Sequence, residues 1–144
     1  MKQLIKVIII FSILLLGACT AAAPPEQAAD SIGETVTLPA GSYTNITPNE
    51  LNTMMENKDF LLVNVHIPYE GDIPGTDLSI PYNDIESHLD LLPEDPDARI
   101  VVYCKSDPMS VMAAETLLEM GYTNLYNLSG GFVAWSAEGL PLEE

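Results

Sequence analysis

Apolar residues between positions 43 and 144 alternate between continuous runs of strand length and segments with helical spacing. The strongest runs are 60–65 and 100–103, and such uninterrupted runs are typical of parallel strands buried on both faces. Weaker runs at 78–80 and 125–128 predict two further strands.

Helical patterns separate these runs. Residues 47–50 read Thr-Pro-Asn-Glu, in which Thr47 can cap a helix and Glu50 can complete a capping box. A second helix is predicted over 83–92. Its buried stripe is predicted to consist of Ile85, Leu89 and Leu92.

Two more helices are predicted in the second half of the chain. The first covers 107–120, with Asp107 as its cap and Pro108 in its first turn, and the second covers 132–137. Alternating strands and helices predict an α/β fold: a three-layer domain over 43–144, in which helices flank a mainly parallel central sheet.

The N-terminus has the pattern of an export signal. Lys2 and Lys6 precede the apolar run 7–16, which is too short to span a bilayer but fits the hydrophobic part of a secretory signal. Leu-Gly-Ala-Cys at 16–19 follows and resembles the lipobox of bacterial lipoproteins. That resemblance implies cleavage before Cys19 and lipidation of its sulfur.

We therefore expect a signal peptide at 1–18, and an anchored lipoprotein on the extracytoplasmic side of a membrane of the bacterial cell envelope. The alternatives are an ordinary signal peptide with an incidental Cys19 and an uncleaved anchor. Residues 19–42 are rich in small residues and proline and predict a flexible tether between the lipid and the domain.

The charge balance excludes one class of partner. The chain has 21 acidic residues against 5 Lys and Arg, and without 1–18 three bases remain against 21 acids, a charge of −18. Such a surface repels phosphate backbones, so we expect no nucleic-acid partner. Two cysteines cannot form a disulfide scaffold, and no Cys/His cluster suggests a metal site.

Cys104 is the residue with the clearest candidate chemistry. It follows a predicted parallel strand and precedes a helix, so N–H groups of 105–107 and 109 could converge on its sulfur. Such surroundings favour the nucleophilic thiolate. Alternatively, Cys104 simply finishes a buried strand, where free cysteine is common.

Four blocks of sequence resemble a known family. Residues 60–66 resemble the apolar-Asp-Val-Arg strand of rhodaneses, and 71–76 resemble their Gly-His-Ile-Pro-Gly-Ala loop. Residues 100–110 match the catalytic strand and loop, and 127–141 match the closing signature. Residues 43–144 thus resemble a single rhodanese domain.

The resemblance implies sulfur transfer. Cys104 would accept a sulfane sulfur from a donor as a persulfide and pass it to a thiol or another nucleophilic acceptor, small molecule or protein, with no metal or organic cofactor. Lys105 stands where many members have Arg. The implied substrate-binding loop consists of Lys105, Ser106, Asp107, Pro108, Met109 and Ser110.

Departures from the family pattern bear on the donor. Asp107 replaces a Gly, Met109 replaces a cation, and Pro108 removes one N–H group. Asp tolerates unusual backbone angles, so we expect the loop to keep its shape. Asn64 and His66 replace the usual Asp and Arg. These changes weaken a site for thiosulfate and favour a thiol persulfide or a protein as donor.

Several alternatives stay open. His66 is either a proton-transfer group or a hydrogen-bonded replacement for the structural Arg. Glu70 and Asp72 either close over the cleft or belong to a solvated loop. The whole domain is either a sulfurtransferase or an inactive rhodanese-like binding module. Cysteine phosphatases are excluded, because the Arg that they need six positions after the cysteine is Ser110 here.

Overall fold

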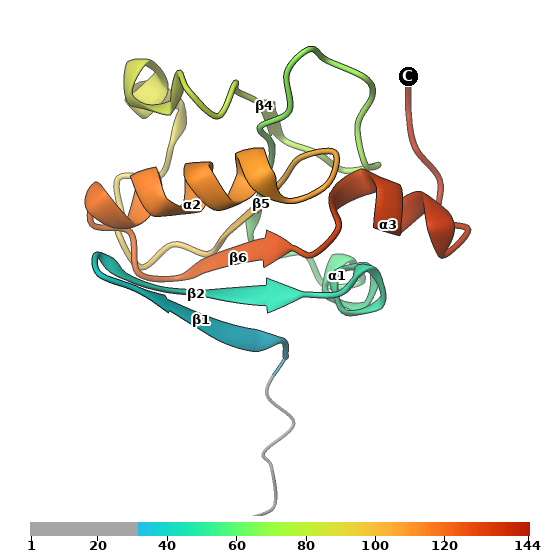
Figure 1. Cartoon of the computed structure of the whole chain (residues 1–144), viewed down its shortest axis with the longest axis horizontal. Coiled ribbons are helices and arrows are strands. Elements are labelled where there is room, and N and C mark those ends of the chain that lie inside the picture. Colours follow the sequence, from blue (N-terminus) through green and yellow to red (C-terminus); the bar gives the residue numbers. More distant parts are fainter. Residues whose placement is uncertain (1–31) are drawn as a thin grey trace, which may run out of the picture.

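The structure is a computed structural model that describes residues 32–144; the predicted signal peptide, Cys19 and the first part of the predicted tether lie outside these residues. Six strands form one sheet in the order β1-β2-β6-β5-β3-β4 (Figure 1). The strands are β1 (Glu34–Leu38), β2 (Gly41–Ile46), β3 (Leu61–Asn64), β4 (Leu78–Ser79), β5 (Ile100–Tyr103) and β6 (Leu125–Leu128). All neighbours are parallel except β1 and β2.

Helices cover both faces of the sheet, which confirms the predicted three-layer α/β fold. The helical elements are α1 (Pro48–Met55), the 3₁₀ helix η1 (Ile85–Leu91), α2 (Pro108–Glu119) and α3 (Gly131–Ala137). Residues of α2 and η1 share one hydrophobic cluster, and residues of α1 and α3 share the other. No helix among the described residues is long and apolar enough to cross a membrane.

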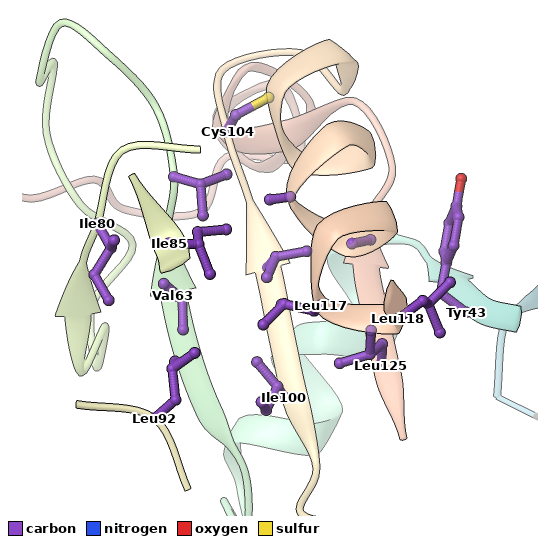
Figure 2. Packing of buried hydrophobic residues seen from close by; sticks show 14 residues of the cluster. Tyr43, Val63, Ile80, Ile85, Leu92, Ile100, Cys104, Leu117, Leu118 and Leu125 are labelled. Carbon is purple, nitrogen blue, oxygen red and sulfur yellow. The ribbon is translucent and has the colours of Figure 1, made fainter. Parts of the chain in front are cut away.

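The surroundings of β5 explain why its sequence is continuously apolar. Ile100 and Val102 point into the cluster on the α2 side, whereas Val101 and Tyr103 point into the other cluster. Both faces of the strand are therefore covered, as expected for a central parallel strand. Cys104 continues the first set and lies beside α2 (Figure 2).

The end of the predicted tether differs from the structure. Residues 34–42 form β1 and the start of β2, an antiparallel pair whose register runs from Glu34–Asn45 to Leu38–Gly41. Val36 and Leu38 alternate with polar residues and pack against the core. Two apolar side chains on an edge strand are too weak a pattern to distinguish from a linker.

Helix α1 begins as predicted. The Thr47 hydroxyl accepts from Glu50 N at 3.3 Å, and Glu50 Oε2 accepts from Thr47 N at 2.7 Å. Glu50 Oε1 also accepts from Gly33 N at 2.9 Å, which fixes the start of the hairpin against the helix. These backbone N–H donors lower the pKa of Glu50.

The predicted stripe of the second helix is only partly right. Ile85 and Leu92 are buried, but Leu89 is 50% exposed. The segment is a 3₁₀ helix with non-helical angles at His88, where φ is −121°. Because three rather than 3.6 residues complete a turn, the α-helical spacing does not keep Leu89 on the buried face.

Candidate active site

Cys104 lies at the carboxyl end of β5 and is buried. Its residue exposure is 1% and its thiol is free. The Ser110 hydroxyl, on the first turn of α2, lies 3.5 Å from Sγ and 3.0 Å from the Asp107 carbonyl oxygen, so it can donate to either. A hydroxyl that can turn toward the sulfur is suited to stabilise a thiolate.

Among residues 32–144, the hydrogen bond to Sγ comes from Ser110. The predicted convergence of backbone N–H groups of the loop on the sulfur therefore stays a prediction. The side chains of Lys105, Ser106 and Pro108 are exposed, and Met109 packs against the cluster on the α2 side.

The backbone of the cysteine loop is held by the N-terminus of α3. Phe132 N donates to the Cys104 carbonyl at 2.9 Å, and Val133 N donates to the Lys105 carbonyl at 3.2 Å. These N–H groups lack partners within their own helix, so the loop satisfies them. A Cβ atom on Gly131 would lie 2.1 Å from the Cys104 carbonyl oxygen, which explains the glycine at this position.

Asp107 is the N-cap residue of α2, as predicted, but its side chain does not bond to the helix. Its φ is +86°, a conformation that favours the Gly found here in the family, and this agrees with the expected tolerance of Asp. Its side chain makes no cap hydrogen bond. Instead, both carboxylate oxygens accept from Gly130 N at 2.9 Å, and Oδ1 lies 3.3 Å from Asn127 Nδ2. The predicted position of the cap is therefore confirmed, whereas the Asp107 carboxylate binds the turn after β6 instead of the first turn of α2.

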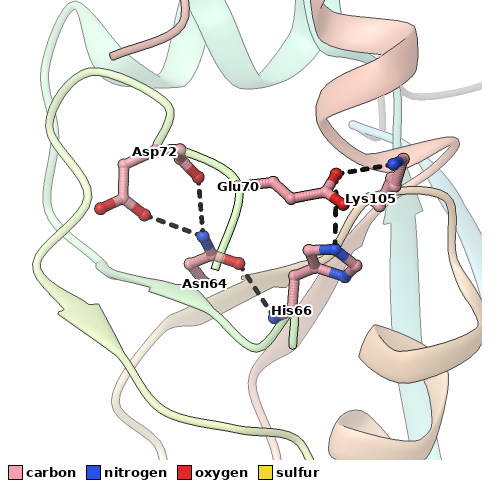
Figure 3. Close-up of polar contacts among 6 residues, drawn as sticks. Asn64, His66, Glu70, Asp72 and Lys105 are labelled. Carbon is pink, nitrogen blue, oxygen red and sulfur yellow. Dashed lines mark hydrogen bonds and ion pairs between the residues drawn. The ribbon is translucent and has the colours of Figure 1, made fainter. Parts of the chain in front are cut away.

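Lys105 meets a carboxylate from the loop that follows β3 (Figure 3). Its Nζ lies 2.6 Å from Glu70 Oε2, and the same oxygen lies 3.7 Å from His66 Nε2. The hydrogen bond from Lys105 lowers the pKa of Glu70. Of the two alternatives for Glu70, the structure favours the one in which it reaches across to the cysteine loop.

His66 is not the hydrogen-bonded replacement for an arginine. Its side chain is only 7% exposed, yet neither ring nitrogen has a hydrogen-bond partner among the described residues. The ring packs edge-on against Phe132 at a centroid distance of 5.4 Å. Its position at the end of β3 keeps the proton-transfer alternative open.

Asn64 and Asp72 organise the opposite end of this loop. Asn64 Nδ2 donates to Gly71 O at 3.0 Å and to Asp72 Oδ1 at 2.8 Å, and Asn64 Oδ1 accepts from His66 N at 3.0 Å. Tyr103 O–H donates to Asp72 Oδ1 at 3.1 Å. Asp72 therefore belongs to a structural network rather than to a closing lid.

Sequence reasoning missed Tyr103. Its hydroxyl accepts from Ile73 N at 3.0 Å and lies 2.7 Å from Thr76 Oγ1, so it fixes the loop before β4. Burial raises the pKa of Tyr103 well above the ordinary value. The sequence signal that could have identified it is a tyrosine at the end of an otherwise aliphatic strand.

Comparisons with known proteins agree with this geometry. The family described as "Rhodanese-like domain" matches residues 47–138. A sulfurtransferase of Allochromatium vinosum is 36% identical over 92 residues, which cover 62% of this chain and 83% of that protein. The thiosulfate sulfurtransferase GlpE of Glaesserella parasuis is 29% identical over 104 residues, or 71% of this chain and 94% of that protein.

Solved structures give the same result. A rhodanese-related protein from Thermoplasma volcanium aligns with a TM-score of 0.59 at 25% identity, over 69% of this chain and 97% of that one. A rhodanese-like domain protein from Staphylococcus aureus aligns with a TM-score of 0.57 at 29% identity, over 69% and 98%. The relatives support sulfurtransferase activity in general, with a sulfur donor and a nucleophilic acceptor. By its matched segment, its relatives and its fold, this chain belongs to the rhodanese-like domain family.

Proposed function

We propose that this protein is a sulfurtransferase that carries a sulfane sulfur as a persulfide on Cys104, outside the membrane to which lipidated Cys19 anchors it. The observation that carries the proposal is a free Cys104 at the end of β5, with the Ser110 hydroxyl 3.5 Å from its sulfur. The family membership makes sulfur transfer the expected use of such a thiol.

The reaction has two displacement steps. The Cys104 thiolate attacks the outer sulfur of a donor persulfide, R–S–SH; the S–S bond of the donor breaks, and R–S⁻ leaves with the bonding electrons. Cys104 then carries –S–SH. An acceptor thiolate attacks that outer sulfur and becomes the new persulfide, while Cys104 leaves as the thiolate. No external oxidant, reductant or metal takes part.

Intact mass of the full chain, purified in detergent, tests the chemistry. Incubation with polysulfide or glutathione persulfide should add one sulfur atom, and Cys104→Ser should abolish the gain. Cys19→Ala is the matched cysteine control and should keep the gain. No adduct with thiosulfate, polysulfide or glutathione persulfide would reject the enzyme in favour of the binding module.

The anchor requires its own experiment. The sequence 16–19 supports lipidation, and the charge of −18 on residues 19–144 (three bases against 21 acids) would be repelled by anionic headgroups, which keeps the domain off the membrane surface. Metabolic labelling with a fatty acid should be lost in Cys19→Ala and retained in Cys104→Ser. Labelling that persists in Cys19→Ala contradicts the anchor.

A further inference from the structure

Glu70 has no role in the sulfur-transfer chemistry described above, yet it contacts the residue next to the nucleophile. We propose that Glu70 is a specificity-determining residue: its carboxylate occupies Lys105 and so makes the site select against small dianionic sulfur donors. This inference rests on the proposed function and extends it to the charge of the donor.

The topology brings the two side chains together. In the parallel pair of β3 and β5, Asn64 lies opposite Tyr103, so the segments that leave these strands start side by side. Glu70 then places Oε2 2.6 Å from Lys105 Nζ, one residue after Cys104 (Figure 3). The cation that would meet an anionic donor is thus already neutralised.

No other described base replaces it. Residues 32–144 contain three basic side chains, counting Lys and Arg, and each has a carboxylate partner. Lys58 pairs with Asp77, and Arg99 pairs with Asp59. To pair with Lys105, an incoming dianion has to displace Glu70, and the freed carboxylate would stay nearby and repel it.

His66 also contributes to the position of the Glu70 carboxylate. Its Nε2 lies 3.7 Å from the same Glu70 oxygen, and the ring is buried without a hydrogen-bond partner in the described part of the chain. Glu70 consequently lies between two nitrogen-bearing side chains on the two loops. A persulfide donor carries less charge than thiosulfate and does not need this cation, so it can react at Cys104 while the pair of Glu70 and Lys105 stays in place.

The first test compares donors of different charge in the full-length chain. Glu70→Gln keeps the shape but removes the charge, and it should raise kcat/KM for thiosulfate, relative to that for mercaptoethanol persulfide, which carries at most one negative charge, by about fivefold to tenfold. Glu119→Gln changes the net charge equally, on an exposed residue at the far end of α2, and should leave the ratio within about twofold. Adding Lys105→Gln to Glu70→Gln should remove the gain.

A second readout does not depend on sulfur transfer. In the Cys19→Ala chain, Cys104 is the remaining cysteine, and intact mass can follow its alkylation by iodoacetate or by neutral iodoacetamide. In both reactions the thiolate displaces iodide. Glu70→Gln should raise the iodoacetate-to-iodoacetamide rate ratio about fivefold, and Glu119→Gln should not.

The two readouts separate the two ideas. Sulfur transfer by the wild type with unchanged ratios in Glu70→Gln overturns the role of Glu70 and leaves the proposed function intact. A raised alkylation ratio without sulfur transfer from any donor overturns the proposed function, while the electrostatic role of Glu70 at Cys104 stands.

Discussion

Two loops meet at the carboxyl edge of the sheet, and they are held in different ways. The loop that carries Cys104 is fixed through its backbone, because Phe132 N and Val133 N of α3 donate to the carbonyls of Cys104 and Lys105. The loop that follows β3 is held by the side-chain amide of Asn64, together with the backbone bridge between Asp72 and Glu143.

The nucleophile and the charged side chains beside it are therefore held by different contacts. The cysteine loop is held by these backbone hydrogen bonds and also by the Asp107 carboxylate, which accepts from Gly130 N at 2.9 Å while Asp107 has a φ of +86°. The charge of Lys105, the residue next to the nucleophile, is instead paired with Glu70 on the other loop.

Gly131→Ala should break the backbone attachment and produce the largest effect. The new Cβ would lie 2.1 Å from the Cys104 carbonyl oxygen, at a φ of +55°. Strain and overpacking together should lower the free energy of unfolding by about 3 kcal/mol. Urea unfolding measures this loss, and persulfide formation on Cys104 should slow in parallel.

Gly139→Ala is the matched control for that substitution. Its φ is +76°, but a Cβ there meets no atom within 4 Å, so it isolates conformational strain at about 1 kcal/mol. Equal losses in the two variants would mean that the close approach to Cys104 contributes nothing.

Tyr103→Phe tests the side-chain attachment and should have an intermediate effect. It leaves the Ile73 N–H and an Asp72 oxygen without their hydroxyl partner. We expect a loss of about 1–2 kcal/mol at pH 7, measured by urea unfolding. A stability equal to that of the wild type would contradict the network.

The same variant has a pH signature. Burial raises the pKa of Tyr103 above that of an unfolded tyrosine, so the folded state favours the neutral phenol. The wild type should therefore lose stability as the pH rises above about 10, and Tyr103→Phe should lose less over that window. If the free energy of unfolding falls equally with pH in both proteins, groups other than Tyr103 cause the loss of stability at alkaline pH.

The local parts of this architecture could be predicted from the sequence. Continuous apolar runs predicted β3 and β5, and the Thr47–Glu50 pair predicted the start of α1, because each signal spans a few neighbouring residues. Cys104 at the end of a strand was predicted for the same reason.

The contacts between loops could not be predicted. The pairing of Lys105 with Glu70 joins residues 35 positions apart, and it depends on the register of two parallel strands. Asp107 turns toward Gly130 because the turn after β6 lies beside it, which a capping pattern cannot reveal. The unpaired nitrogens of His66 likewise depend on what the fold places around the ring.

His66→Leu should give the smallest effect and the opposite sign. Because Nδ1 of His66 is buried without a polar partner and Nε2 has only Glu70 Oε2 at 3.7 Å, a side chain of similar volume without polar atoms removes an unfavourable desolvation. We expect a gain of roughly 0.5–1 kcal/mol in the free energy of unfolding at pH 8. His88→Leu should bring no gain, because Nδ1 of His88 already lies 2.9 Å from the Asp84 carbonyl oxygen. If His66→Leu destabilises the protein as much as Tyr103→Phe does, then the ring nitrogens are partnered in solution, and the two ends of this loop are held in the same way.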